Sequence, residues 1–200
     1  MNITKKLVSI TICYSLFIQL LTTGISLDGF NKKIDKKDEV LKEILGLETI
    51  VQIVEGFAYL WISFSINDLS KMLDRRYMDW VITTPLMLLS TIIFMKYNEH
   101  KEKQKKPIKF MSFIKDNQNI IIQIVVLNAL MLLFGYLGEK RIMNKEISIF
   151  IGFMFFFWVF KIIYEKYVNG ITVNKSLYCF VVIIWALYGV AATFNKEFKH

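Results

Sequence analysis

The sequence predicts an all-α protein, a transmembrane bundle of six helices, on three observations. Apolar residues make up 54% of the 200-residue chain and gather in six continuous blocks of roughly 20 residues, the length that crosses a hydrocarbon core of about 30 Å. Charged residues, 21% of the total, fall mostly between these blocks. Only two prolines and nine glycines occur, which suits long helices, and the blocks lack the alternation of β-barrel strands.

The predicted spans cover residues 7–28, 46–67, 75–96, 118–138, 146–167 and 176–194. Their connections are mostly short, so we predict one domain over residues 1–200. The first block lacks a small-residue cleavage site and is expected to stay as a span rather than be removed as a signal peptide. Cys13 and Cys179 both lie in apolar blocks, where buried, unpaired thiols are expected rather than a disulfide or a metal site.

The net charge of +8 is better explained by basic loops at a membrane surface than by nucleic-acid binding. Two loops, 29–45 and 97–117, are rich in lysine: Lys32, Lys33, Lys36, Lys37 and Lys42 in the first, and Lys101, Lys103, Lys105, Lys106, Lys109 and Lys115 in the second. The positive-inside rule places these loops in the cytoplasm and the N-terminus outside. Membrane lipid is the expected partner, nucleic acid is not, and a homo-oligomer is left open.

Nothing in the sequence indicates an enzyme. It contains no metal-ligand cluster, nucleophile elbow or phosphate-binding loop, so we predict neither catalysis nor a metal site. His100 lies in a loop and His200 at the end of the chain, where solvent-exposed side chains are expected.

The third block carries charged residues at membrane depth, where they are costly and usually functional. Arg76 and Asp79 are three residues apart, and Thr83 follows Asp79 by four, so the three share one helix face. Pro85 removes a backbone donor and permits a bend. A carboxylate at this depth needs a positive partner or a proton. Asp79 therefore predicts a functional site, although a structural Arg–Asp pair is the alternative.

Two further spans carry ionisable groups. Glu48 and Glu55 are seven residues apart in the second block and share a helix face, which suggests a hydrated path for cations. Alternatively, Glu48 lies at the interface, and Glu55 is a protonated acid bonded to a neighbouring helix. Lys161 follows an aromatic run, 153–160, and a buried amine there can form a Schiff base. Its position near the end of the span favours a side chain that extends toward the headgroups.

The third block also carries a specific motif. The run Arg76–Trp80, followed by Thr83–Leu86, resembles the third helix of microbial rhodopsins. In the fourth block Asn128, Met131 and Gly135 have the spacing of that family's retinal-ring contacts. In the sixth, Trp185 and Tyr188 match its aromatic pair, with Gly189 where many members have proline. The resemblance implies a rhodopsin-like bundle with all-trans retinal as cofactor.

The resemblance also implies roles for individual residues. Asp79 is expected to be the counterion and proton acceptor of the protonated Schiff base, Arg76 to stabilise that charge, and Thr83 to bond the counterion. The implied retinal pocket consists of Trp80, Thr84, Met87, Asn128, Met131, Gly135, Trp185 and Tyr188. Without the third-helix motif, ordinary packing would explain these aromatic and methionine side chains equally well.

Ser90 departs from the pattern of outward proton pumps, which usually have a carboxylic acid at this donor position. A serine cannot hold and deliver a proton at neutral pH. Asp79, Thr83 and Ser90, together with Glu48 and Glu55, are similar to giant-virus rhodopsins described as light-gated cation channels, and Ser15 matches their helix-one serine. The resemblance thus implies a light-gated channel for monovalent cations or protons. A light-driven outward proton pump and a photosensor without transport remain alternatives.

The family attaches retinal to a lysine in a seventh helix, and no seventh apolar block follows residue 194. We therefore expect the sequence to be truncated or a fragment of a longer product, with six of seven spans present. Lys161 lies at the wrong depth and in the wrong helix to replace that lysine. The Schiff-base lysine is consequently unknown and is not assigned to any residue of this chain.

Overall fold

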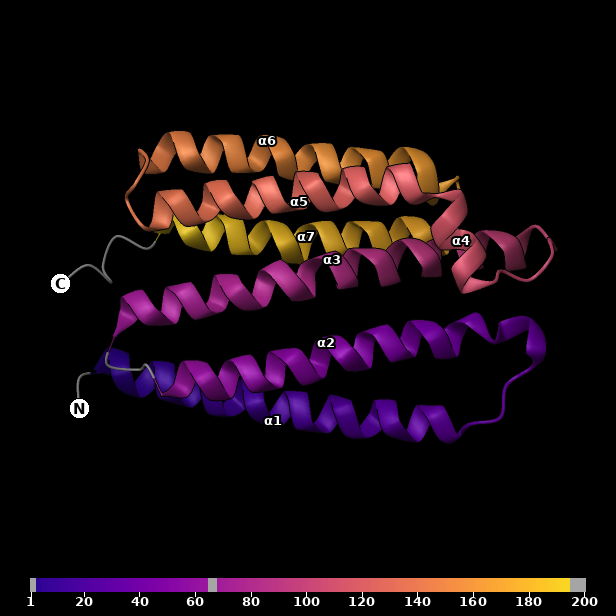
Figure 1. Ribbon diagram of the computed structural model, residues 1–200, viewed down its shortest axis with the longest axis horizontal. Coiled ribbons are helices and arrows are strands. Elements are labelled where there is room, and N and C mark those ends of the chain that lie inside the picture. Colours follow the sequence, from indigo (N-terminus) through magenta and orange to yellow (C-terminus); the bar gives the residue numbers. More distant parts are fainter. Residues whose placement is uncertain (1–2, 65–67, 195–200) are drawn as a thin grey trace. The chain divides into compact units, whose positions relative to one another are not determined.

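A computed structural model describes residues 3–64 and 68–194 and shows helices throughout these ranges (Figure 1). In chain order the elements are α1 (Ile3–Asn31), the 3₁₀ turn η1 (Lys36–Asp38), α2 (Val40–Ser63), α3 (Leu69–Glu102), α4 (Phe110–Asp116), α5 (Gln118–Glu139), α6 (Lys145–Ile163), the π-helix η2 (Tyr164–Val168) and α7 (Thr172–Phe194). Within these ranges six helices are long and apolar enough to cross a membrane. The predicted all-α fold with six spans is confirmed.

Most of the helices extend beyond the apolar blocks that predicted them. Helix α3, for example, begins at Leu69 and ends at Glu102, whereas the apolar block covers 75–96. Lysine and glutamate favour helix, so the backbone continues into the polar flanks. The last residues of the second predicted span, 65–67, lie outside the described residues. The short elements η1 and α4 were not predicted because they lie in polar connections.

The chain divides into two compact units, Met1–Thr91 and Ile92–His200, with the boundary inside α3. The prediction of a single domain stays a prediction. In the first unit α1 packs along α2, and α2 is joined to the start of α3 by Arg75. Its guanidinium donates a hydrogen bond to the main-chain oxygen of Trp61 and lies 4.6 Å from the centre of the indole ring.

In the second unit, small residues bring α5 and α6 close together. Ser148 is fully buried and donates a hydrogen bond to the main-chain oxygen of Phe134 on the facing helix. A Cβ atom at Gly138 would lie 2.6 Å from the Ser148 hydroxyl oxygen, so only glycine fits there. Close backbone approach through small residues is typical of helices packed within membranes.

A buried asparagine fixes the start of α7 in the second unit. The Asn174 side chain is fully buried and donates to the main-chain oxygens of Met95, at 2.8 Å, and Tyr167, at 3.0 Å. It accepts a hydrogen bond of 3.0 Å from Asn98. Because an unpaired buried amide would be costly, these contacts specify how the turn after η2 packs against the end of α3.

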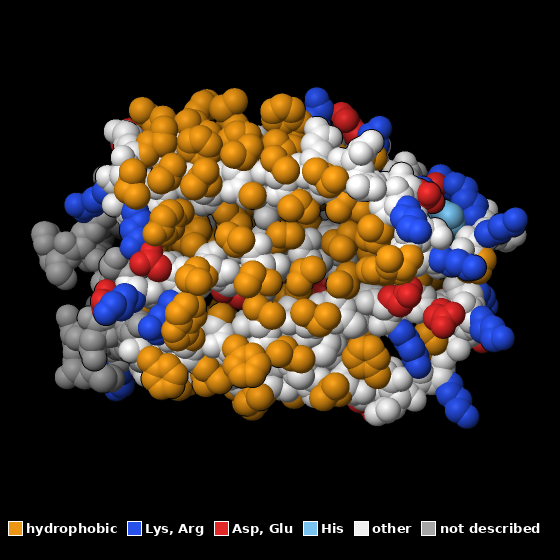
Figure 2. All heavy atoms as spheres, in the orientation of Figure 1, with side chains coloured by type: hydrophobic (Ala, Val, Ile, Leu, Met, Phe, Trp, Pro, Cys, Tyr) orange, Lys and Arg blue, Asp and Glu red, His pale blue; other side chains and the backbone are white. Residues whose placement is uncertain are grey.

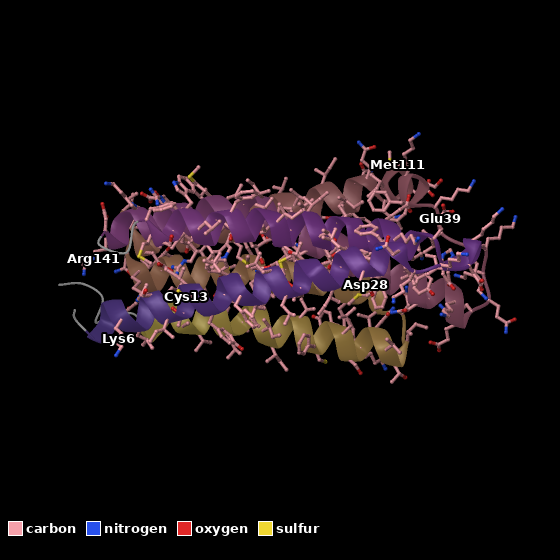
Figure 3. All side chains as sticks on the ribbon, turned by 90° about the horizontal axis from the view of Figure 1, so that it is seen from below. Lys6, Cys13, Asp28, Glu39, Met111 and Arg141 are labelled. Atoms are coloured by element: carbon pink, nitrogen blue, oxygen red, sulfur yellow. The ribbon has the colours of Figure 1, made fainter. Side chains whose placement is uncertain are left out.

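Large apolar side chains cover the outer surfaces of the helices, with charged side chains toward the helix ends (Figure 2). Leu20 is 74% exposed and Phe150 is 67% exposed, as expected for residues that face lipid tails. Cys13 and Cys179 were predicted to be buried, and this prediction is wrong. Both thiols are free and exposed on helix surfaces (Cys13 is labelled in Figure 3), where lipid supplies the apolar surroundings that the prediction assigned to the core.

Candidate functional site

A row of hydrogen-bonded polar side chains joins α1 to α2 in the first unit. The Gln19 side-chain amide donates to a carboxylate oxygen of Glu55. Further along the two helices, the Ser26 hydroxyl donates to the Gln52 side-chain oxygen at 3.1 Å. Gln52 and Glu55 lie on the same face of α2 as Glu48, at spacings of three and four residues. We call this row, with its continuation to α3, the polar seam.

The polar seam continues between α2 and α3. The Ser90 hydroxyl hydrogen-bonds a carboxylate oxygen of Glu48 and also lies 2.9 Å from the main-chain oxygen of Met87 in its own helix. Ser90 is 2% exposed, so this contact is shielded from water. Glu55 thus bonds a neighbouring helix, as one of its two predicted alternatives states, and Glu48 does so too. A hydrated path for cations along these acids stays a prediction.

Asp79 is a buried acid with one unused acceptor. The residue is 8% exposed, and within the described residues its Oδ1 atom has no hydrogen-bond partner. The Arg76 guanidinium lies over the Trp80 ring at 5.0 Å from its centre, one helical turn from Asp79. The pairing of Arg76 with Asp79 stays a prediction. A buried oxygen without a donor is costly, so this site is suited to receive a cationic or donor group from a ligand.

The predicted contact between the Thr83 hydroxyl and the Asp79 carboxylate is wrong in this structure. Thr83 is fully buried, and its hydroxyl donates to the main-chain oxygen of Asp79 at 3.0 Å. Threonine in a helix readily bonds the carbonyl four residues earlier. Thr84 does the same with the main-chain oxygen of Trp80, at 2.7 Å. In the helical turn just before Pro85, both threonine hydroxyls therefore donate to main-chain oxygens of their own helix.

Sequence reasoning missed half of the polar seam. Gln19, Ser26 and Gln52 were not singled out, although each lies three, four or seven residues from another polar residue on its helix. Ser15, which was singled out, is half-buried and takes no part in the three hydrogen bonds of the seam. It lies four residues before Gln19 and so shares the face of α1 that carries the seam. The signal that could have found the seam was the helical spacing of polar residues in two adjacent spans.

The second unit contains the other predicted pocket residues, on α5 and α7. Asn128 is buried, and Met131 and Gly135 are half-buried. The half-buried Trp185 lies edge-on against Phe160, with ring centres 5.8 Å apart. Tyr188, by contrast, is 60% exposed. Asn128, Met131, Gly135 and Trp185 are therefore at least partly inside the unit, and the Tyr188 side chain lies mostly on its surface.

Aromatic residues of α6 form a cluster that the predicted pocket did not include. The rings of Phe153, Phe156 and Phe160 pack against one another along one face of α6. A Cβ atom at Gly189 would lie 2.6 Å from the Phe153 ring. The glycine that departs from the usual proline thus leaves room for this ring. The spacing of 153, 156 and 160 was the available signal.

Lys161 does not occupy a buried site. Its side chain is 71% exposed, and its Nζ atom lies 3.9 Å from a carboxylate oxygen of Glu165. This position agrees with a lysine that extends from the helix surface.

Nearly the whole chain matches one family of known proteins. The model of the family described as bacteriorhodopsin-like protein matches residues 10–198. The chain belongs to this family of microbial rhodopsins. No curated protein matches this rhodopsin significantly, but solved structures do.

The crystal structure of the viral rhodopsin OLPVRII is 26% identical and has a TM-score of 0.76, over 95% of this chain and 85% of the other. A blue light-absorbing proteorhodopsin from Med12 shares the fold, with 17% identity and a TM-score of 0.70, over 94% of this chain and 79% of the other. The predicted likeness to giant-virus rhodopsins is confirmed. As a member of the family, the protein is an integral, multi-pass membrane protein.

Retinal is the chromophore of this family and the cofactor assigned to this chain. Each unit, taken by itself, contains residues that fit it. In the first unit, the Oδ1 atom of Asp79 is buried and has no hydrogen-bond partner among the described residues, so it is available to a cationic group. In the second, Trp185 and Phe160 contribute aromatic rings, packed edge to face with centres 5.8 Å apart, of the kind that pack against a conjugated chain.

Proposed function

We propose that this rhodopsin is a retinal-binding, light-gated cation channel whose cations cross along the polar seam. One observation carries the proposal. Three hydrogen bonds, Gln19 to Glu55, Ser26 to Gln52 and Ser90 to Glu48, place amides, hydroxyls and carboxylates along α1, α2 and α3. Such a row supplies oxygen ligands that replace the water of a passing cation, and its two carboxylates disfavour anions.

Asp79 and the polar seam have separate parts in this proposal. Bound retinal supplies light absorption and a change of shape next to α3. Asp79 holds the negative charge that stabilises a cationic chromophore. Arg76, which lies against the Trp80 ring, places a positive charge one helical turn away. Ser90 lies eleven residues after Asp79 on α3, about 16 Å along the helix. A movement of α3 at Asp79 therefore reaches the Ser90–Glu48 bond through one continuous helix.

The proposed orientation puts the N-terminus outside and the lysine-rich connections after α1 and α3 in the cytoplasm. Monovalent cations or protons are the proposed transported ions. The side chains of the polar seam offer oxygen ligands, including two carboxylates, and none of them is a soft sulfur ligand of the kind that selects a transition metal. The seam's narrow hydrogen-bonded pairs must separate before a hydrated ion passes.

A second candidate is a light-driven outward proton pump, and one contact favours it. Ser90 stands at the donor position, and it bonds an acid that comes from α2 instead of α3. Glu48 can thus hold a proton beside the place where pumps of the family carry their own carboxylic acid.

Light-induced currents at controlled voltage separate the two candidates. Cells that express the protein with all-trans retinal are illuminated at a series of membrane voltages. A channel gives currents that reverse sign at a potential that follows the cation gradient. Currents that keep one sign at every voltage would reject the channel and support the pump.

A further inference from the structure

The end of α3 carries an unusual buried carboxylate. Glu99 is 4% exposed. It accepts hydrogen bonds from the ammonium groups of Lys96 at 2.8 Å, Lys105 at 2.9 Å and Lys103 at 3.2 Å. The side-chain amide of Asn169 also donates to it at 3.0 Å. One negative charge thus gathers three positive charges and can balance only one of them.

The side chains of the three lysines are only partly buried in this cluster. Their side chains are 28% exposed for Lys96, 44% for Lys103 and 46% for Lys105. Each ammonium group has three donors, and Glu99 uses one of them on each lysine. The remaining donors are therefore held close together and partly exposed. Holding flexible lysines in place beforehand reduces the entropy lost when an anion binds.

The charge around the cluster is strongly positive. Residues 96–109 contain six lysines and two glutamates. Lys106 and Lys109 are exposed, and the next acidic residue is Asp116. Lys and Arg side chains gather on the surface beside α4 (Figure 2). Such a density of lysine next to a membrane span attracts anionic lipid surfaces.

The depth of the cluster matches the headgroup layer. Glu99 follows Arg76 by 23 residues on α3, a distance of about 35 Å at 1.5 Å per residue. The hydrocarbon core is about 30 Å thick, so with Arg76 inside the span, Glu99 lies beyond the core, on the side of the headgroups.

Helix α4, which follows the lysines, combines a buried and an exposed apolar residue. Phe113 is 4% exposed, whereas Met111 is 63% exposed (labelled in Figure 3). Apolar side chains next to lysines are typical of segments that lie at the membrane interface.

We propose that Lys96, Lys103 and Lys105, arranged by Glu99, bind the phosphate group of an anionic phospholipid, with Lys106 and Lys109 adding attraction. The lipid's acyl chains lie along the apolar surface of the span, and Met111 inserts beside them. The depth of the cluster and the neighbouring apolar residues favour a lipid over a soluble phosphate. This site is independent of how the protein responds to light.

Lipid selectivity tests the site in the full chain. The protein is reconstituted into phosphatidylcholine membranes, and the immobilised fraction of spin-labelled phosphatidylglycerol is compared with that of spin-labelled phosphatidylcholine. We expect a preference for phosphatidylglycerol that falls as salt is raised. The double substitution Lys103→Gln/Lys105→Gln should lower the relative affinity about 25-fold, since one lysine near the surface contributes roughly a fivefold factor.

Two comparisons keep the test specific. Lys106→Gln/Lys109→Gln leaves Glu99 and its three lysine partners intact and should weaken the preference less. The matched control, Lys36→Gln/Lys37→Gln, removes the same charge from the connection after α1 and should leave it nearly unchanged. An equal loss in the control would show diffuse attraction and overturn the site. Displacement of the labelled lipid by inorganic phosphate, beyond that by chloride at equal ionic strength, would also overturn it.

Discussion

Ser90 and Glu48 are joined by a single hydrogen bond between α3 and α2, and a double-mutant cycle measures its contribution. We compare the free energies of unfolding of Ser90→Ala, Glu48→Ala and the double variant in mixed detergent. Hydrogen bonds between membrane helices contribute about 0.6 kcal/mol on average and up to about 1.7 kcal/mol. Because this bond is shielded and its acceptor is an acid, we expect a coupling energy of about 1 kcal/mol.

Thr91 provides the control for this cycle. Its hydroxyl donates to the main-chain oxygen of Met87 in its own helix, at 2.7 Å, so Thr91→Ala should show almost no coupling to Glu48→Ala. A coupling energy near zero for Ser90 as well would mean that the two helices are not joined by this bond.

Substitution of Glu55 tests whether the transported cation passes this carboxylate of the polar seam. Glu55→Gln keeps an oxygen that can accept from Gln19 and removes only the charge. We expect a changed reversal potential or a smaller conductance, because the passing cation loses one negative ligand. The absorption maximum should change little, since the charge of Asp79 is retained.

Glu43→Gln is the matched control on the same helix, because Glu43 is exposed in the first turn of α2. Equal selectivity and conductance in Glu55→Gln and the unmodified protein would remove Glu55 from the ion path.

Close packing of α5 and α6 is tested by the same substitution at two glycines. At Gly138 an added Cβ would lie 2.7 Å from the Ser148 Cβ atom, whereas at Gly56 it would meet no atom within 4 Å. We expect Gly138→Ala to lower the free energy of unfolding by about 1–3 kcal/mol through overpacking. Gly56→Ala should raise it by roughly 0.5–1 kcal/mol, because alanine stiffens the unfolded chain and favours helix. Thermal unfolding in lipid nanodiscs gives the sign of each change, and equal stability of the two variants would contradict the tight α5–α6 contact.

At the scale of the whole molecule, hydropathy was sufficient to predict the fold class and the location of every span. Lipid requires long apolar helices with internally bonded backbones, so the pattern of apolar blocks carries this information directly. Hydropathy does not report short elements in polar connections, and η1 and α4 were missed for that reason. The buried Asn174 and Glu99 were missed too, because they bond residues about 70 to 80 positions away in the chain, which composition does not reveal.

The candidate site was predicted less completely. The position of Asp79 followed from one charged residue in an apolar block, and its burial agrees with that reasoning. The partner of Thr83 was wrong, because spacing cannot tell whether a hydroxyl bonds a carboxylate or the nearby main-chain oxygen. Gln19 was missed because an uncharged amide gives a weak signal until a facing acid is known. Contacts between spans depend on how the helices rotate against each other, which a single sequence does not specify.

The central claim is that the buried carboxylate of Asp79 is the counterion of a retinal chromophore, and absorption spectroscopy tests it most directly. The unmodified protein and Asp79→Asn are each incubated with all-trans retinal in membranes and washed. Removing the negative charge destabilises the positive ground state more than the excited state, so the visible band of Asp79→Asn should move to longer wavelength. Asp28→Asn is the control, because Asp28 is 65% exposed and pairs with Lys32 at the surface. A wash-resistant band at the same wavelength in all three proteins would contradict the claim.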